Sequence, residues 1–295
     1  MYDWRVKALM TWIDKNKQDG RLSMDLLSKA GHLDQYHYLG LACNDQVIDI
    51  LGLSPGTKIL DVGCGIGGPA RYLAWKSGCS VTGVDIQEQL VITGNKVTQL
   101  VGLESKVELV AADVCNMGSV ESGEFDAFIS LLVILHISDR EKLFNSLFGQ
   151  LKEGAGFLIE DMIALRCDFN EKETRIAKDV IGSPLLPTID EYRDHLESAG
   201  FVDVEFEQLT PEWSQWCVDR SNQYDASKDM QIKTFGEKIY NQRSSFYAQV
   251  KRLFLSGKLG GVRITGRKPS RVEVAIRAHR QRTPQIVGRS SILEQ

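Results

Sequence analysis

A glycine-rich loop follows the first apolar segment that is typical of a buried strand. It lies in KILDVGCGIGGPARYLA, residues 58–74. Gly63, Gly65 and Gly68 satisfy the pattern G-x-G-x-x-G, in which a strand turns tightly into a helix and its backbone approaches a ligand closely. A dinucleotide fits this pattern, because its pyrophosphate binds at such a helix N-terminus. The neighbouring side chains therefore have to decide which ligand the loop holds.

Three carboxylates stand where successive predicted strands end. Asp61 precedes Gly63 by two residues, Asp85 closes SVTGVD, and Asp113 closes VELVAAD. Ligands of open α/β sheets bind at the carboxyl ends of the strands. Asp61 would repel a pyrophosphate but suits a cationic amino-acid group, whereas Asp85 can accept from ribose hydroxyls and Asp113 from an adenine amino group. Each carboxylate alone also fits a helix N-cap or a loop end, but together they favour S-adenosylmethionine as the cofactor.

The same segments resemble the class I S-adenosylmethionine-dependent methyltransferases. The matching pieces are LDVGCGIGG, GVDI, AADV, FDAFISLLVILH and LKEGAGFLIED, between about residues 57 and 162. The resemblance implies a Rossmann-like, doubly wound α/β sheet of seven strands whose last strand, GVRITGRK, is antiparallel. We add Leu131, at the end of the fourth strand, to the cofactor-site residues that the resemblance implies, which are Asp61, Gly63, Gly65, Asp85, Ile86, Asp113 and Val114.

His136 follows the fourth predicted strand in VILHISD, at the mouth of the expected cofactor site. Methyl transfer requires an aligned donor and acceptor and a free lone pair on the acceptor, and a base helps when the acceptor arrives protonated. A histidine at this position can supply that base, although an isolated histidine is often structural. The chemistry requires no metal, and the six cysteines form no C-x-x-C pair or metal-like cluster, so we expect no metal ion.

Residues 1–45 are expected to form a helical flap ahead of the first strand. Within it, HLDQYHYLG packs Tyr36, His37 and Tyr38 among polar residues, either as a lid that packs its aromatic rings on the core or as a flap that reaches the acceptor. This segment and the one around His136 are similar to the small-amine branch of the methyltransferases, which includes the phosphoethanolamine and sarcosine/dimethylglycine enzymes. The phosphoethanolamine enzymes pair a flap tyrosine with a histidine after the fourth strand. The resemblance thus implies Tyr36 and His136 as catalytic residues, and we add His37 as a substrate contact.

Two departures from that branch leave the acceptor open. Its members usually carry an acid four residues before the histidine, where this chain has Leu132, and the C-terminal region lacks their basic, tryptophan-flanked phosphate pattern. The segment GGPAR is also similar to the sterol C-methyltransferases. We predict N-methylation of a small amine or amino acid. The alternatives are O-, S- or C-methylation of a more apolar, sterol- or natural-product-like molecule, and a regulatory module that binds S-adenosylmethionine without turnover.

A second helical region, at about residues 211–258, is expected to form a cap before the last strand. Its segment TPEWSQWCVDRSNQY spaces Trp213, Trp216, Arg220 and Tyr224 by three or four residues. Aromatic rings can hold a methylated ammonium, and an arginine can bind a carboxylate through two hydrogen bonds. The same spacing is typical of a helix face that packs in a core. We predict Trp213, Trp216 and Arg220 as substrate contacts, with core packing as the alternative.

The elements that must position these residues follow a repeated βα rhythm. Near-continuous apolar strands alternate with helices such as PARYLAWKSG and REKLFNSLFGQL, a pattern that favours a parallel sheet covered on both faces. A capping box from Thr188 to Glu191 predicts a further helix. We divide the chain into the flap at 1–45, a methyltransferase domain at 46–269 that includes the cap, and a basic tail at 270–295.

Composition limits the partners and the location. A net charge of −4 and a pI near 5.8 give no reason to expect nucleic-acid binding, and the arginine-rich tail is expected to be solvated. The longest apolar run, FISLLVIL, is too short to cross a bilayer, and the N-terminus has no signal-peptide block. With cysteines that read as reduced thiols, these features predict a cytoplasmic enzyme acting on a small molecule.

Overall fold

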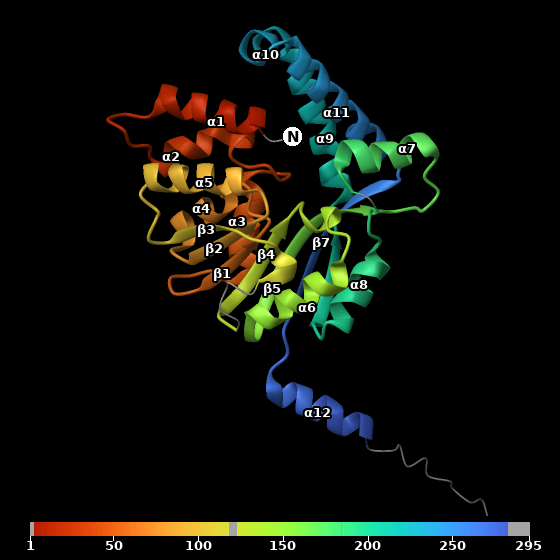
Figure 1. Ribbon diagram of the computed structural model, residues 1–295. Helices are drawn as coiled ribbons and strands as arrows, with labels where there is room; N and C mark the ends of the chain where they lie inside the picture. The colour runs from red at the N-terminus through yellow and green to blue at the C-terminus, as the bar shows by residue number, and fades with distance from the viewer. Residues whose placement is uncertain (1–2, 118–122, 184, 283–295) are drawn as a thin grey trace, which may run out of the picture.

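A computed structural model describes residues 3–117, 123–183 and 185–282. Within these residues, one seven-stranded sheet has the order β3-β2-β1-β4-β5-β7-β6 (Figure 1). Strands β1 to β5 pair in parallel, and β7 runs antiparallel to both β5 and β6. The prediction of a doubly wound sheet with an antiparallel last strand is confirmed. The strands are β1 Lys58–Val62, β2 Ser80–Asp85, β3 Val107–Ala111, β4 Phe125–Leu131, β5 Leu151–Ala164, β6 Val202–Gln208 and β7 Leu259–Arg267.

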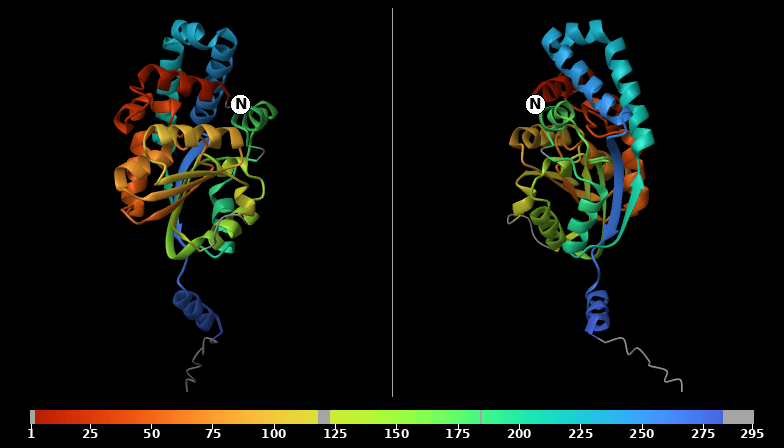
Figure 2. Two further views of the ribbon diagram at one scale, coloured as in Figure 1. Left: turned by 60° about the vertical axis from the view of Figure 1, so that its left-hand side comes forward. Right: turned by 90° about the vertical axis from the view of Figure 1, so that its right-hand side faces the viewer.

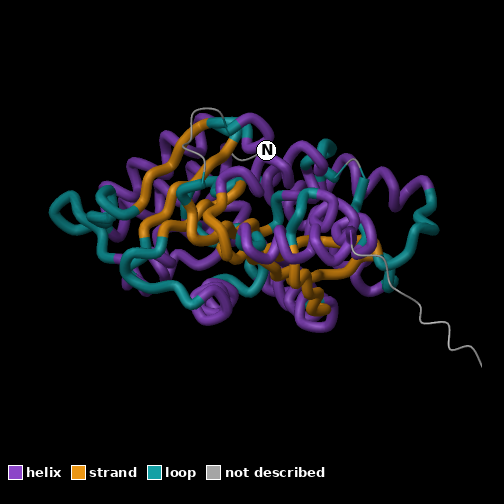
Figure 3. The backbone as a smooth tube through the Cα atoms, turned by 90° about the horizontal axis from the view of Figure 1, so that it is seen from below, coloured by secondary structure: helices purple, strands orange, loops and turns teal. Residues whose placement is uncertain are grey.

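Helices cover both faces of the sheet, as Figure 3 shows from below. On one face, α3 (Leu41–Leu51), α4 (Gly68–Ser77) and α5 (Glu88–Leu100) contribute to one apolar cluster with strand residues. On the other face, α6 (Arg140–Gln150) and α8 (Ile189–Ser198) pack around Phe128 and Phe157, whose rings stack at 5.0 Å. The predicted capping box is present at the start of α8. This two-sided burial explains why the parallel strands are apolar almost throughout.

Two helical groups lie over the end of the sheet where the parallel strands terminate (Figures 1 and 2). The first is N-terminal and comprises α1 (Asp3–Asn16), α2 (Met24–Leu27) and a 3-10 helix (Ser28–Leu33). The second lies between β6 and β7 and comprises α9 (Thr210–Ala226), α10 (Lys228–Phe235) and α11 (Glu237–Leu255). These groups correspond to the expected flap and cap, and their position over the strand ends is where a ligand would have to enter.

Short irregular helices carry the chain across the same end of the sheet. They are the 3-10 helices Val114–Asn116 after β3 and Ile134–His136 after β4, and α7 (Glu171–Arg175) with a π-helix (Ile176–Ile181) after β5. Strands β3 and β4 end earlier than the sequence pattern predicts. Asp113 leaves its strand to cap the first 3-10 helix, and Leu132 has a φ of +60°, which ends β4.

The C-terminal helix α12 (Arg271–Arg282) stands away from the rest of the molecule (Figure 2). The Arg267 side chain ties the start of this segment to the sheet through Glu273, at 2.6 Å. The last part of the predicted basic tail, residues 283–295, lies outside the described residues. In the described part of the chain, no helix combines the length and the apolar character that a bilayer crossing demands.

Candidate active site

The glycine loop packs closely against two other segments. Gly63 has a φ of +70°, and a Cβ atom there would lie 2.3 Å from the Val133 side chain, just beyond β4. At Gly68 a Cβ atom would lie 2.0 Å from the backbone oxygen of Asp34, in the N-terminal flap. Glycine is required at both positions because any side chain would push a neighbouring segment away. The loop therefore brings the end of β1, the exit of β4 and the flap together.

A small cavity lies at this junction. Its volume of about 50 Å³ has room for a small polar or charged end group. The side chains and backbone that line it come from the flap, the glycine loop and β4: Asp34, Tyr36, His37, Asp61, Gly63, Cys64, Gly65, Ile66, Pro69 and Leu131. Four of the predicted cofactor or flap residues, Tyr36, His37, Asp61 and Leu131, thus share one cavity with Gly63 and Gly65.

Asp61 is the acidic group in this cavity. Its side chain is 2% exposed, and its Oδ2 atom has no hydrogen-bond partner among the described residues. Burial, and secondly the nearby charge of Asp85, raises the pKa of Asp61 to about 7. A buried carboxylate without a partner is unfavourable, so this position calls for a cationic or hydrogen-bond-donating ligand group.

The other two carboxylates partly serve the backbone. Asp85 accepts hydrogen bonds of 2.8 Å from the backbone nitrogens of Gly65 and Gln87, which fixes the glycine loop against the end of β2. Asp113 caps its 3-10 helix through Cys115 N, and this bond is the main reason that its pKa lies below its ordinary value. The N-cap alternative therefore applies to Asp113, although a carboxylate that accepts one bond per oxygen retains further acceptor sites.

The residues that follow these carboxylates differ sharply in exposure. Ile86 is 71% exposed, which is unusual for an isoleucine, whereas Val114 is buried in the core. An exposed apolar side chain directly after Asp85 is suited to packing against a flat ring. Val114 instead packs in the apolar core beneath the 3-10 helix that follows β3.

The flap is held on the cofactor loop by an ion pair that the sequence analysis missed. Arg71 and Asp34 are both buried, with Nη2 and Oδ1 2.6 Å apart. Arg71 also donates to the backbone oxygen of Ile66 at 2.6 Å, inside the glycine loop. No local pattern signals this pair, because its members lie 37 residues apart and each reads as an ordinary charged residue.

Tyr36 and His37 differ in how they meet the cavity. The Tyr36 ring approaches Gly65, since a Cβ atom there would lie 4.0 Å from Tyr36 Cδ2, and the Arg5 guanidinium lies 4.4 Å from the centre of the same ring. His37 is buried, with its ring nitrogens 3.0 Å from the Tyr38 carbonyl oxygen and 3.1 Å from Gln35 Oε1. Burial lowers the pKa of His37 to about 4. These contacts give His37 a structural role in shaping the flap.

His136 lies beyond the cavity lining, as the exposed last residue of the 3-10 helix after β4. Its Nδ1 atom is 3.0 Å from the backbone oxygen of Gly182, at the end of the π-helix. A carbonyl only accepts, so Nδ1 carries the proton and Nε2 of the neutral ring keeps a free lone pair. The two predicted catalytic residues thus come from different segments, Tyr36 from the flap and His136 from the 3-10 helix after β4.

Asp161 on β5 positions the loop that carries His136. It is fully buried and accepts from Leu135 N at 2.8 Å and from the Tyr192 hydroxyl at 2.7 Å. Burial raises the pKa of Asp161 to about 6. The residue just before His136 is therefore anchored to the centre of the sheet.

The predicted cap residues differ in their burial. Trp213 is fully buried, and its ring fills the space over Gly261 on β7 and meets Tyr38 edge-on at 4.6 Å. These contacts favour core packing, the alternative to a substrate contact, for this tryptophan. Trp216 is half-buried and stacks on Tyr38 at 4.3 Å, and Arg220 lies 5.4 Å from the centre of the Tyr247 ring. These two remain beside the flap.

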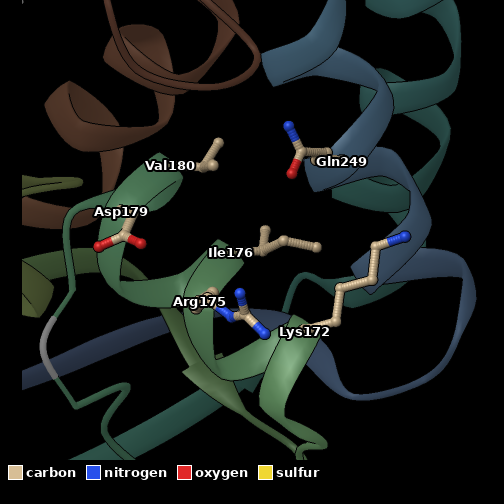
Figure 4. A pocket seen from close by; sticks show the side chains of 6 residues that line it. All are labelled: Lys172, Arg175, Ile176, Asp179, Val180 and Gln249. Atoms are coloured by element: carbon tan, nitrogen blue, oxygen red, sulfur yellow. The ribbon is translucent and has the colours of Figure 1, made fainter.

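A larger hollow lies away from the glycine loop, between the π-helix and α11 (Figure 4). It measures about 400 Å³ and is lined by Lys172, Arg175, Ile176, Asp179, Val180 and Gln249. None of the predicted site residues lines it. Its basic side chains share the hollow with Asp179, and Arg175 also lies 3.9 Å from Glu171.

Comparison with known proteins finds a family model that matches most of the chain. The family model described as mycolic acid cyclopropane synthetase matches residues 39–263. A phosphoethanolamine N-methyltransferase of Triticum aestivum is 31% identical over 229 residues, which cover 74% of this chain and 44% of the relative. A sterol 24-C-methyltransferase of Eremothecium gossypii is 30% identical over 155 residues, which cover 51% of this chain and 41% of the relative. The chain therefore spans less than half the length of these curated relatives.

Solved structures share the fold. A protein of Galdieria sulphuraria, provisionally assigned as a sarcosine dimethylglycine methyltransferase, aligns with a TM-score of 0.72 at 16% identity, over 92% of this chain and 100% of that one. The matches confirm the resemblance to class I methyltransferases and to their small-amine branch.

Proposed function

Because the chain belongs to the mycolic acid cyclopropane synthetase family, we propose that it is an S-adenosylmethionine-dependent methyltransferase that methylates the nitrogen of a small amine or amino acid. The wheat relative, which is named for methylating the nitrogen of phosphoethanolamine, supports this class of acceptor. The single observation that carries the proposal is Asp61, a buried carboxylate with an unpartnered oxygen in the glycine-loop cavity.

The residues at the strand ends fit this cofactor. Asp61 and the small cavity would hold the ammonium of its amino-acid end, Asp85 the ribose hydroxyls, and the exposed Ile86 one face of the adenine. Gly63 and Gly65 allow the backbone to approach, while Leu131 closes the cavity from β4. Asp113 and Val114 complete the edge of the site. When bound, S-adenosylmethionine supplies an electrophilic methyl group on a positively charged sulfur.

The chain has to align the acceptor and accept a proton. An ammonium must lose a proton before its nitrogen has a lone pair, and the transfer of one methyl group leaves that nitrogen with one more carbon substituent. In the proposed mechanism, His136 accepts the proton at Nε2, because Nδ1 is committed to the Gly182 carbonyl. Tyr36 closes over the acceptor from the flap, and Asp161 keeps the His136 loop in place through Leu135.

The test is turnover by the purified protein, followed as release of S-adenosylhomocysteine. The acceptor panel contains glycine, sarcosine, dimethylglycine, phosphoethanolamine, a thiol acid and a sterol. In the variant His136→Ala we expect kcat to fall by about a hundredfold or more, with unchanged affinity for S-adenosylhomocysteine. Equal turnover in the variant would remove His136 from the mechanism. Cofactor binding without turnover on any acceptor would favour a regulatory module.

A second candidate function is methylation of a more apolar acceptor at carbon, oxygen or sulfur. It is favoured by Leu132, which packs beside an apolar cluster that includes Leu135, Met162 and Ile181, and by the similarity to a sterol methyltransferase. Activity confined to the sterol or the thiol acid in the same panel would select this candidate.

The predictions on partners and location belong to the same proposal. Neither a role for the basic tail nor nucleic-acid binding is required by the proposed chemistry. A cytoplasmic location is supported by six free cysteines, four of them buried, which suit a reducing compartment. Fractionation of cells that express the full chain tests this location.

A further inference from the structure

Three arginines converge where the N-terminal helix meets the cap. Arg5 comes from α1, Arg220 from α9 and Arg243 from α11. The guanidinium of Arg243 lies 3.7 Å from the centre of the Trp4 ring, and Arg220 and Arg243 each lie 3.4 Å from the Tyr247 hydroxyl. We call Arg5, Arg220 and Arg243, together with His32 and Tyr247, the arginine cage.

The positive charge of the arginine cage is not neutralised within the described chain. No described carboxylate forms an ion pair with Arg5, Arg220 or Arg243. By contrast, Arg71 and Arg263 each contact a buried carboxylate at 2.6 Å, and the third buried arginine among the described residues of the sheet domain, Arg140, donates to the backbone oxygen of Leu185. Arg243 is buried and Arg5 and Arg220 are partly buried, so gathering their three positive charges without a described carboxylate is costly and calls for an anion.

Several donors inside the cage also lack partners. Arg243 is only 8% exposed, and its Nε atom has no hydrogen bond, as is also true of Arg220 Nε and His32 Nε2 among the described residues. The contacts that Arg220 and Arg243 make with Tyr247 are long, and tyrosine rings hold the arginines mainly by cation–π attraction. Arginine forks that keep free N–H groups are suited to bidentate binding of an oxyanion.

The electrostatics of the neighbours agree with this geometry. Burial lowers the pKa of His32, and the charges of Arg5, Arg220 and Arg243 lower it further. Burial opposes ionisation of Tyr247, yet the same three arginines bring its pKa below the ordinary value. The charges of all three arginines thus shift the pKa values of both His32 and Tyr247.

The arginine cage adjoins the cofactor cavity through Tyr36. One end of the Tyr36 ring approaches Gly65 in the cavity, and Arg5 lies 4.4 Å from the centre of the ring. His32 lies 6.4 Å from Tyr36 and 5.9 Å from Trp216, ring centre to ring centre. A small molecule held by the cage at one end can therefore present its other end past Tyr36 to the cofactor side.

We propose that the arginine cage binds an anionic group of the methyl acceptor, of the size of a phosphate or a carboxylate. That the anion belongs to the methyl acceptor rests on the proposed function, but anion binding itself is measurable without turnover. Because Arg5 belongs to the flap and Arg220 and Arg243 to the cap, a bound anion would also draw these two segments together over the site. On this proposal the acceptor is a molecule that carries both an amine and a carboxylate or phosphate group, rather than a neutral apolar molecule.

The experiment measures anion binding by the full, tag-free chain, through the rise in Tm with inorganic phosphate at constant ionic strength set with sodium chloride. We expect Arg220→Gln and Arg5→Gln to weaken phosphate binding by about tenfold or more, because each removes a charged donor. Arg175→Gln is the matched control, since it removes an arginine from the separate hollow between the π-helix and α11 (Figure 4). This variant should bind phosphate as the wild type does. Arg243→Gln is included, but its burial makes it the variant most prone to unfold.

Acetate in place of phosphate distinguishes the two anions, and the stronger binder identifies the acceptor group. If neither anion raises the Tm beyond the effect of sodium chloride, or if Arg220→Gln and Arg5→Gln bind as the wild type does, the arginine cage is only a structural stack and the inference fails. Anion binding that depends on the cage in a protein that turns over no acceptor would instead contradict the proposed function and leave the anion site in place.

Discussion

The cofactor edge, formed by the strand ends that carry Asp61, Asp85 and Asp113, and the arginine cage carry opposite charges and adjoin each other at Tyr36. On one side, Asp61, Asp85 and Asp113 stand at the ends of adjacent strands. On the other, Arg5, Arg220 and Arg243 lie together without an ion pair to any described carboxylate. The two sites also differ in the groups that form them. The cofactor edge is formed by backbone and short side chains, whereas the cage is formed by long side chains stacked on aromatic rings.

This polarity would orient both reactants. On the two proposals, the acidic edge would attract the cationic end of the cofactor and the cage would attract the anionic end of the acceptor, so the reacting atoms would meet between them near Tyr36. A molecule that carries both charges would be held in one direction only. On this proposal, charge would select the orientation of the acceptor before any single residue contacts the reacting atoms.

The largest effect on stability should come from removing the ion pair that holds the flap against the cofactor edge. Asp34→Asn leaves Arg71 buried without its carboxylate, so we expect the free energy of unfolding to fall by about 3–5 kcal/mol. Denaturant titration of the wild type and the variant measures this loss. The variant should also bind S-adenosylhomocysteine more weakly, since the same ion pair holds the flap on the glycine loop.

Asp168→Asn provides the control for that comparison. Its ion pair with Arg166 is exposed on both sides, so its removal should cost less than about 1 kcal/mol. If the two variants lost similar stability, the buried pair would not be the link that joins the flap to the cofactor edge.

A smaller effect is expected from pH, and it concerns the acidic edge alone. Asp61 has its pKa raised to about 7, so without ligand it is largely protonated below that value. Binding an ammonium favours the carboxylate, so the affinity for S-adenosylhomocysteine should fall by about tenfold for each pH unit below 7. Calorimetry between pH 5.5 and 7.5 measures this slope, which Asp61→Asn should abolish.

The same raised pKa values set the direction for stability without ligand. Asp61 and Asp161 bind protons more tightly in the folded chain than in the unfolded one, so their contribution is complete below about pH 4 and is lost as the pH rises through about 6 to 7. An affinity for S-adenosylhomocysteine that did not change with pH in this range would show that Asp61 does not meet the ammonium.

The acidic edge was predictable from the sequence because its determinants are local. Asp61, Gly63 and Gly65 lie within five residues, and the parallel sheet brings Asp85 and Asp113 to the same edge by its repeat alone. The βα rhythm indicated the parallel, doubly wound sheet, and the family resemblance implied the antiparallel last strand, β7.

The arginine cage was not predictable, because its members are far apart in the chain and have no shared pattern. Arg5 and Arg243 come together only after two helical groups, each with its own core, pack over the sheet. The helical spacing of Trp213, Trp216 and Arg220 indicated one face but not which residue turns to the core. Trp213 turned inward because Gly261 leaves room for its ring.

The smallest expected effect tests whether the acceptor side can be changed without touching the cofactor edge. Leu132 has a φ of +60°, a conformation that aspartate adopts more readily than leucine, so Leu132→Asp should leave stability nearly unchanged. It would place a carboxylate between the two sides, and the KM for ammonium-bearing acceptors should fall by about two- to fivefold, the range of a partly exposed ion pair. Leu132→Asn is the matched control, because it shares the backbone preference without the charge. A lower KM in both variants would attribute the effect to the backbone, and a changed affinity for S-adenosylhomocysteine in Leu132→Asp would show that the two sides are not independent.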